Sequence, residues 1–442
     1  MTAREVALQV VRDVFPAQGT QERTAQEALD YRLRKSDLDA RDRAFATVLA
    51  FGSIKMRRTL DWYLQPYVGD RNKPIDPAIH EVLRLAIYEL RFTNAQPHAT
   101  VSQWVDLAKR YGHRGTAGLT NAVLRGFLRD KPNAPQRADF ENDDDYLGAA
   151  FSFPTWIVRQ WRGVFGDERI ESILEACNAP AQAAIAVNRA KTTREDAVAY
   201  FEQHGAQAQA SQLADDAVLV SDAALARSGE RSASGAWWVQ SEASASVVDI
   251  LNPQPGETIL DACSGRGSKA LQSAARLDGD GALTCIERDA RKAAALEQRA
   301  AAAQVPIAMI VGDATAPIVQ GRFDRILIDA PCSGTGVLGR HPEARWRKRP
   351  DDGERLALTQ RALLEALAPH VHEGGALVYA VCSVDPRETT AVIDWFLRSH
   401  DMHRGLLPAR FADFETDAGD VLIPPGLQGR DGFFVARLER RA

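Results

Sequence analysis

Apolar residues recur at helical spacing through the first 130 residues of the chain. Within 45–51 and 79–90 they fall at i, i+3 and i+4, which is the pattern of amphipathic helices that share a core. The next stretch is polar, loses this spacing and contains Pro132 and Pro135. The pattern predicts an all-helical domain over 1–130 and a linker over 131–150.

The pattern is mixed between residues 151 and 235. Helical spacing covers 156–164 and 196–204, whereas the apolar runs AAIAVN and AVLVSD have the length of strands. We expect a small α+β domain over 151–235.

From residue 236 to residue 442, short β-rich runs alternate with helical segments. The runs are ETILDA, ALTCIE, IAMIVGD, RILIDA and ALVYAVCS. Such alternation is typical of a parallel sheet that is covered by helices on both faces. The sequence therefore predicts a doubly wound, Rossmann-like α/β domain over 236–442.

Composition narrows the class of protein. A chain of 442 residues exceeds one ordinary core, and it has no apolar stretch long enough to span a membrane. Its first residues lack the basic end and apolar block of a secretory signal, so we expect a cytoplasmic protein. The five cysteines lie far apart, which favours free thiols. With a net charge of -5, any binding of nucleic acid must rest on local basic surface.

Three successive strand ends carry residues that suit a nucleotide-like ligand. A turn with Gly265 and Gly267 follows ETILDA, Glu287 ends the next run, and Asp313 follows the third. The glycines allow close approach of a ligand, and the acids can accept hydrogen bonds from ribose hydroxyls and from an adenine amino group. The same turn, read to Ala270, also satisfies the dinucleotide fingerprint of an NAD-dependent oxidoreductase, so it does not decide between the two.

Two cysteine motifs follow the last two strands. Asp329-Ala330-Pro331-Cys332-Ser333 comes after RILIDA, and Cys382-Ser383 comes after ALVYAV. Both cysteines should lie at carboxyl ends of parallel strands, where open sheets place their ligand crevice. The alternative for each cysteine alone is burial as a small apolar side chain.

These motifs resemble the signatures D-A-P-C-S and T-C-S of the RNA (cytosine-5) methyltransferase family. The rest of the chain resembles the family's RsmB (Sun/Fmu) branch, in which a NusB-like domain precedes the catalytic domain. The matching stretches are LTNAVLRGFLR at 119–129, F-P-T-W at 153–156, Q-S-E-A-S at 240–244 and D-G-F-F at 431–434. The resemblance implies a multidomain protein with an all-α NusB-like domain, a small α+β domain and a Rossmann-like methyltransferase domain.

The resemblance also implies a reaction. The family methylates carbon 5 of a cytosine in RNA with S-adenosylmethionine, and this branch acts on small-subunit (16S) ribosomal RNA; transfer RNA stays an open alternative. Carried onto this chain, Cys382 is the nucleophile that adds to carbon 6, Asp329 hydrogen-bonds the base edge, and Cys332 assists release. The implied cofactor residues are Asp261, Cys263, Ser264, Gly265, Arg266, Gly267, Ser268, Lys269, Glu287, Asp313 and Asp329.

A basic run follows the first cysteine motif and resembles the family's R-H-P-x-x-x-W segment. Positive side chains around an aromatic ring suit phosphate contacts and base stacking, although an isolated run of this kind is more often solvated surface. We expect an RNA-binding loop here, with further RNA contacts from the helical domain, in a monomer without a metal or a membrane. Its residues are Arg340, His341, Arg345, Trp346, Arg347 and Lys348.

The cofactor loop departs from the family pattern D-x-C-A-A-P-G-G-K-T. This chain reads D-A-C-S-G-R-G-S-K-A, so Arg266, Ser268 and Ala270 replace proline, glycine and threonine. We expect these replacements to affect cofactor affinity more than any other property. Two alternatives therefore stand beside the methyltransferase: a catalytically silent RNA-binding protein of the same fold, and an NAD-dependent oxidoreductase, which leaves the cysteine motifs unexplained.

Overall fold

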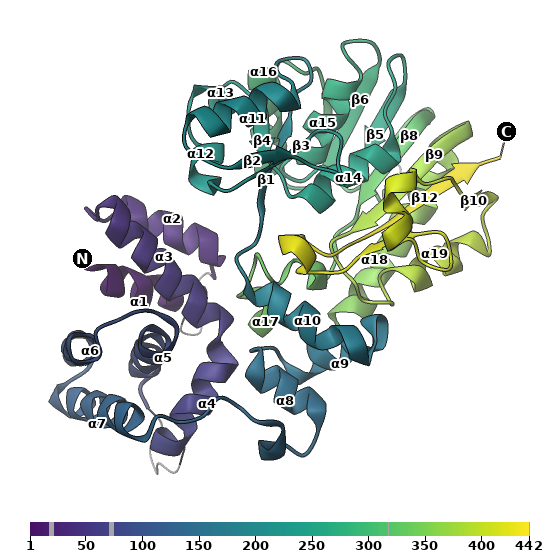
Figure 1. The fold of residues 1–442 in the computed structure, drawn as a ribbon. Helices are drawn as coiled ribbons and strands as arrows, with labels where there is room; N and C mark the ends of the chain where they lie inside the picture. Colours follow the sequence, from purple (N-terminus) through teal and green to yellow (C-terminus); the bar gives the residue numbers. More distant parts are fainter. Residues whose placement is uncertain (17–21, 70–74, 317, 442) are drawn as a thin grey trace. The chain divides into compact units, whose positions relative to one another are not determined.

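The computed structural model describes residues 1–16, 22–69, 75–316 and 318–441, and it divides into two compact units (Figure 1). Unit 1 comprises Met1–Arg162 and His341–Lys348, and unit 2 comprises Gly163–Arg340 and Arg349–Ala442. The predicted helical domain includes 17–21 and 70–74, which lie outside the described residues. None of the described helices is long and apolar enough to cross a membrane.

Unit 1 is helical, as the apolar spacing predicts. Its helices up to residue 130 are α1 (Ala3–Val14), α2 (Ala25–Arg34), α3 (Ala40–Lys55), α4 (Arg57–Val68), α5 (Pro77–Phe92), α6 (Pro97–Tyr111) and α7 (Arg114–Asp130). Their apolar faces form one core around α1, α3 and α5. Within it, the buried carboxylate of Glu89 accepts hydrogen bonds from Trp104 Nε1 (2.9 Å) and from Arg4. The core thus fixes the helices through apolar contacts and one satisfied buried charge.

The predicted linker contains a helix. The short 3-10 helix η1 (Arg137–Asp139) is followed by α8 (Asp143–Ala150) and α9 (Thr155–Phe165). Asn142 caps α8 by accepting a hydrogen bond from Asp145 N (2.9 Å), and three aspartates occupy the first turn. Acids there suit the positive end of the helix dipole. The polar composition that indicated a linker is partly that of a helix N-terminus.

The first part of unit 2 is the small α+β domain. It contains α10 (Asp167–Asn178), β1 (Ala183–Val187), α11 (Arg194–Gln203), β2 (Ala208–Ala210), β3 (Ala217–Val220), α12 (Ala223–Arg227), α13 (Glu230–Ala233) and β4 (Trp237–Val239). The strands form an antiparallel sheet in the order β2-β3-β1-β4. Phe201 of α11 shares an apolar core with Ile185, Val218 and Trp237, which lie on strands of this sheet.

The larger sheet of unit 2 is mixed. Its strands are β5 (Thr258–Asp261), β6 (Ala282–Glu287), β7 (Ala308–Val311), β8 (Phe323–Asp329), β9 (Val371–Val381), β10 (Met402–Arg404), β11 (Val421–Ile423) and β12 (Phe433–Arg440). Strands β5 to β9 pair in parallel in the order β9-β8-β5-β6-β7, as predicted. Strands β10 to β12 pair antiparallel at the β9 edge, which the alternating runs did not indicate.

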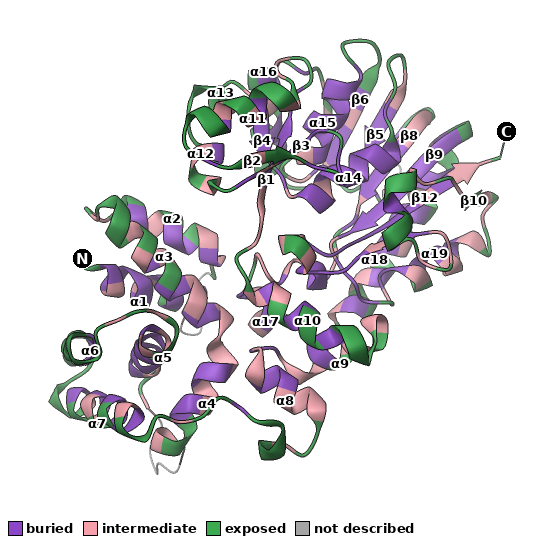
Figure 2. Cartoon of the chain, viewed as in Figure 1, coloured by how far each residue is buried: buried purple, intermediate pink, exposed green. Residues whose placement is uncertain are grey.

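Helices cover both faces of this sheet (Figure 2). One face packs on α14 (Glu242–Leu251), α15 (Ser268–Arg276) and α16 (Ala290–Ala303), the other on α18 (Asp352–Leu367) and α19 (Thr390–Leu397). Neighbours on a strand point to opposite sides, as Ile259 and Leu260 show by entering different cores. Parallel pairing then brings the carboxyl ends of β5, β6, β8 and β9 to one edge.

Several short helices complete the chain. These are α17 (Ala344–Arg347), η2 (Thr335–Val337), η3 (Ala368–His370), η4 (Ala409–Phe414) and η5 (Leu427–Gly429).

Candidate active site

The two signature cysteines meet at the carboxyl edge of the sheet. Strand β8 pairs with β9 so that Asp329 lies opposite Ala380, and Cys332 Sγ is 3.4 Å from Cys382 Sγ. Both expected cysteines therefore face one site. Each is a free thiol and is partly accessible.

The C-terminal D-G-F-F stretch holds the Cys332 turn in place. Gly336 N donates to Cys382 O (3.0 Å), and Gly432 N donates to Gly336 O (2.7 Å). A Cβ on Gly336 would lie 2.1 Å from Gly432 O, so this backbone contact requires glycine. Motifs nearly 100 residues apart in the sequence thus form one structural element beside the thiols.

The environment of Cys332 favours its protonated form. The hydrogen bond with Cys382 and burial raise the pKa of the Cys332 thiol well above its usual value, and the negative charges of Glu388 and Asp329 act in the same direction. At neutral pH, Cys332 is therefore a thiol beside the sulfur of Cys382.

Asp329 is paired with a buried lysine. Lys269 Nζ lies 2.7 Å from Asp329 Oδ2, and the same ammonium lies 5.2 Å from the ring centroid of Phe433. Asp261 is buried nearby, and burial together with the charge of Asp329 raises its pKa to about 7, against the opposing effect of Lys269. Sequence reasoning placed Lys269 in the cofactor loop and missed its pairing with Asp329.

A cavity of about 330 Å³ adjoins this site in unit 2. Five of the expected cofactor residues line it: Cys263, Gly265, Glu287, Asp313 and Asp329. Sequence reasoning missed other lining residues, among them Ile286, Arg288, Lys292, Thr315, Pro331 and Leu363. Most of these residues lie next to the predicted positions at the strand ends, and Leu363 lies on α18. A sequence pattern does not show that these segments meet at one cavity.

The acids of the cavity are held in place by backbone amides. Glu287 accepts hydrogen bonds from Gly265 N and Asp289 N, both at 2.8 Å. Asp313 accepts from the backbone and hydroxyl of Thr315, which lowers the pKa of the Asp313 carboxyl. Burial raises the pKa of Cys263, so this wall of the cavity carries a neutral thiol.

Other residues of the loop shape the turn from behind. Ser264 Oγ donates to Asp261 O (3.0 Å), and Cys263 N donates to Asp261 Oδ1 (3.3 Å). Gly267 has a φ of 81°, and a Cβ there would lie 2.0 Å from Leu296 Cδ1. Asp261, Ser264, Gly267 and Ser268, which starts α15, are not among the residues that line the cavity.

The replacements at Arg266, Ser268 and Ala270 also lie outside the cavity lining. Arg266 is exposed and its carbonyl oxygen accepts from Arg299, whereas Ala270 is buried in the core. Arg266, Ser268 and Ala270 thus do not line the cavity, whereas Gly265, where the family pattern has alanine, does.

The basic segment differs from the expectation at three residues. Arg345 is fully buried, its guanidinium 3.7 Å from the ring centroid of Phe153. Trp346 Nε1 donates to Ile54 O (2.7 Å), and Arg347 Nη2 donates to Arg23 O (2.7 Å). These side chains are engaged by the backbone and core of unit 1, so in this conformation Arg345 cannot contact RNA.

The other three residues of that segment are more open. His341 is exposed and Lys348 is half-buried. Arg340 is half-buried, pairs with Asp431 (3.2 Å) and donates to Gln182 O (3.0 Å).

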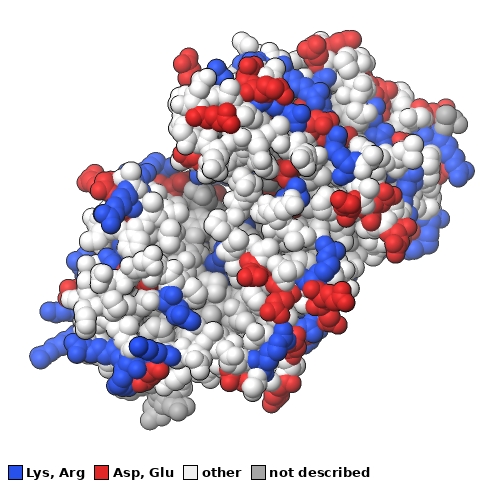
Figure 3. Space-filling model, viewed as in Figure 1, with Lys and Arg blue, Asp and Glu red and all other residues white. Residues whose placement is uncertain are grey.

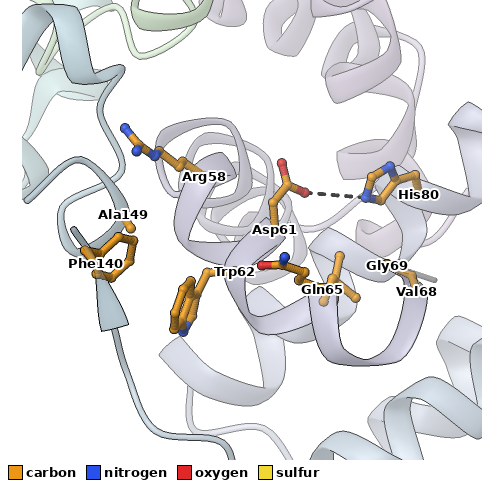
Figure 4. A pocket seen from close by; sticks show the side chains of 10 residues that line it. Arg58, Asp61, Trp62, Gln65, Val68, Gly69, His80, Phe140 and Ala149 are labelled. Atoms are coloured by element: carbon orange, nitrogen blue, oxygen red, sulfur yellow. Dashed lines mark ion pairs between the residues drawn. The ribbon is translucent and has the colours of Figure 1, made fainter. Parts of the chain in front are cut away.

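Unit 1 holds a second cavity, of about 360 Å³, between α4, α5 and the segment around Phe140 (Figure 4). Its carboxylate, Asp61, already pairs with His80 (3.4 Å) and Arg84 (2.7 Å). The ring of Trp62 stacks on Phe140. With its acid neutralised and no cysteine in its wall, this cavity offers no equivalent of the cysteine site.

Family models match three parts of the chain. The model described as 16S rRNA methyltransferase RsmB/F matches residues 248–439, the NusB family matches 1–129, and the RsmF/B-like ferredoxin-like domain matches 153–225. These matches follow the order of the observed domains.

Similar proteins agree. A Synechocystis protein named "probable ribosomal RNA small subunit methyltransferase B" is 32% identical over 100% of both chains. A Bacillus subtilis protein of the same name is 31% identical over 92% of this chain and 93% of its own. The crystal structure of PH0851 shares the fold over 100% of this chain and 99% of its own, with a TM-score of 0.83 and 24% identity. The structure of NSun6 from Pyrococcus horikoshii with SFG covers 66% of this chain and 99% of its own, with a TM-score of 0.60 and 18% identity.

The alternative of an NAD-dependent oxidoreductase is wrong, because full-length relatives above 30% identity carry a methyltransferase name and the glycine turn was its sole support. The chain belongs to the RsmB/F family of 16S rRNA methyltransferases.

Proposed function

We propose that this protein transfers the methyl group of S-adenosylmethionine to carbon 5 of a cytosine in small-subunit ribosomal RNA, with Cys382 as the nucleophile. The 3.4 Å separation of the Cys332 and Cys382 sulfurs, beside Asp329, carries this proposal. The names of the relatives support the class of RNA.

The chemistry of cytosine explains the need for a thiolate. Carbon 5 is a poor nucleophile until a bond to carbon 6 turns it into an enamine-like centre. The Cys382 thiolate forms that bond. Lys269, paired with Asp329, supplies positive potential at the site. When bound, S-adenosylmethionine supplies an electrophilic methyl group.

Asp329 and Lys269 act on the base. The Asp329 carboxylate accepts a hydrogen bond from the exocyclic amine, which orients the ring toward Cys382. The Lys269 ammonium offsets the negative charge that spreads into the ring as the thiolate adds. This interaction is stronger in the transition state than in the bound substrate, so it raises the rate rather than the affinity.

Release leaves both cysteines as thiols. The carbon 5 proton must leave, the sulfur–carbon 6 bond must break, and the 5,6 double bond must re-form. Cys332, a thiol 3.4 Å from Cys382, gives its proton to the departing sulfur and takes the carbon 5 proton in exchange. The exchange balances, because the proton replaced at carbon 5 ends on the pair of thiols, and Cys382 then loses one proton to water before the next addition.

The cavity beside the thiols fits S-adenosylmethionine. Its volume lies within the range of small-molecule sites, and its wall combines apolar Ile286 and Leu363 with two acids. Glu287 would accept from the ribose hydroxyls and Asp313 from the adenine amino group. The backbone of Gly265 leaves room for close approach.

RNA contacts are proposed at two places. His341 and Lys348 are accessible in the basic segment.

In unit 1, basic side chains gather over α6 and α7 (Figure 3). Residues 107–131 contain six lysines and arginines but one acid, Asp130, and Lys109, Arg114 and Arg125 are exposed. Arg114 lies at the N-terminus of α7, where the helix dipole disfavours a cation, so a phosphate partner would explain its place.

Labelled methyl transfer to RNA that lacks the modification tests this function. We expect 5-methylcytosine with the intact protein and with the control Cys177→Ala, whose thiol is buried and belongs to neither cysteine motif. Cys382→Ala should abolish transfer. Binding of RNA without any transfer by the intact protein would instead favour the catalytically silent alternative.

A further inference from the structure

Glu388 is a fully buried acid that joins the two cysteine turns in unit 2. Its Oε1 accepts hydrogen bonds from Ser333 N (2.8 Å) and Gln360 Nε2 (3.0 Å). Its Oε2 accepts from Ser383 Oγ (2.6 Å) and from Ser333 Oγ. Because Ser333 follows Cys332 and Ser383 follows Cys382, one carboxylate connects the residues next to both thiols.

Further hydrogen bonds tie the two turns together. Ser383 Oγ lies 3.0 Å from Thr335 Oγ1, which in turn accepts from Val384 N (3.1 Å). Gln360 also donates to Pro331 O (3.0 Å), and Tyr379 OH donates to Glu388 O (2.6 Å). The network therefore reaches the strand before Cys382 and the helix α18 that packs beside Cys332.

A buried charge of this kind is costly to keep. A carboxylate without water needs several hydrogen bonds to offset its desolvation, and an apolar side chain of similar size would avoid that cost. Here three of the four donors come from the cysteine turns and the fourth is Gln360 of α18, so loss of the carboxylate leaves polar groups of both turns unpaired.

We propose that Glu388 is a positioning residue for methyl transfer, whose buried carboxylate holds the Cys332 and Cys382 turns in one register. This inference rests on the proposed function, because it gives both cysteines a role in the reaction. Glu388 acts through Ser333 and Ser383.

The charge of Glu388 also acts on the Cys332 thiol. Its negative charge is one of the causes that raise the pKa of Cys332. Two sulfurs in contact should not both be ionised, since like charges in one site disfavour each other. The charge of Glu388 favours a protonated Cys332, which the proton exchange during release requires.

The first test compares Glu388→Ala with Glu388→Gln in steady-state methyl transfer. The glutamine oxygen can accept from Ser333 N and Gln360, and its amide can donate to reoriented hydroxyls. We expect the alanine variant to lose at least about 100-fold in kcat with the KM for RNA within about threefold, and glutamine to restore kcat to within about tenfold of wild type.

Asp420→Asn is the matched control, because Asp420 is a fully buried carboxylate paired with Arg404 in the same unit. It should lower the melting temperature and leave kcat unchanged. Wild-type kcat in Glu388→Ala, or an equal loss of kcat in Asp420→Asn, would overturn the positioning role.

The second test does not depend on methyl transfer. In a Cys382→Ser background, the rate of iodoacetamide alkylation of Cys332 is followed against pH by peptide mass spectrometry, with and without Glu388→Gln. We expect the midpoint to fall by about one pH unit when the charge is removed. An unchanged midpoint would overturn the charge effect. A shifted midpoint here, together with a wild-type protein that transfers no methyl in the first test, would contradict the proposed function and leave this effect standing.

Discussion

Lys269 Nζ lies 2.7 Å from Asp329 Oδ2, so an ion pair joins the helix after β5 to the end of β8 at the edge where the two cysteines meet. The lysine is almost entirely buried and the aspartate is one-third exposed. The cation is therefore fixed by the protein, while its partner stays open to a substrate.

Replacement of Lys269 should impair the chemical step. In Lys269→Met the Asp329 carboxylate keeps its place but loses its counter-charge, so we expect kcat to fall by about 100-fold or more. The KM for RNA should change little, because Lys269 is buried. Steady-state kinetics separate the two parameters. A large rise in KM at constant kcat would show that Lys269 serves binding instead.

Asp261 should make stability depend on pH. Its folded pKa of about 7 lies above the usual 3.8, so its contribution is complete below about pH 4 and is lost as pH rises through 7. Asp261→Asn has no carboxyl at this position and avoids this loss. Its free energy of unfolding, relative to that of the wild type, should therefore increase by up to a few kcal/mol when the pH is raised from 4.5 to 8. Urea unfolding at both pH values measures the difference. If the variant's free energy of unfolding fell relative to that of the wild type as the pH rises, the raised pKa of Asp261 would be contradicted.

Cofactor affinity should depend on Glu287 and hardly on the altered loop. Glu287→Ala removes the proposed acceptor for the ribose hydroxyls, so we expect S-adenosylmethionine to bind about 10- to 100-fold more weakly. Arg266→Pro restores the family's residue at an exposed position and should stay within about threefold of wild type. Calorimetric titration measures both. A tenfold gain in Arg266→Pro would show that the departure weakens the site.

The basic face of α6 and α7 should account for part of the RNA affinity. Replacing Lys109, Arg114 and Arg125 by alanine should weaken binding and reduce the slope of log K against log salt by about three, one for each phosphate contact. The control removes three exposed cations that lie among acids in the same unit: Arg34, Lys35 and Arg41. Equal effects of the two triple variants would argue against a specific surface.

The sequence predicted the sites that follow strand ends. Glu287 and Asp329 end recognisable strands, Gly265 and Asp313 follow strands within four residues, and parallel pairing brings such positions to one edge. The same logic predicted that Cys332 and Cys382 would meet, which their sulfur separation confirms.

Other features depend on tertiary contacts that no local pattern carries. Arg345 has the composition of a phosphate ligand, yet it is buried against Phe153, nearly 200 residues earlier. Glu388 looks like an acid before a helix, and its link to Ser333 appears only when β8 and β9 pair. The aspartates in the first turn of α8 looked like linker because helix N-termini and linkers share polar residues.

The covalent adduct tests the central claim most directly. Cys332→Ala is incubated with S-adenosylmethionine and unmodified small-subunit RNA, and the protein is analysed by denaturing electrophoresis and peptide mass spectrometry. The proposed exchange of protons predicts a stable protein–RNA adduct attached through Cys382, absent from Cys332→Ala/Cys382→Ala. Normal turnover without adduct in Cys332→Ala, or an adduct that persists without Cys382, would contradict it.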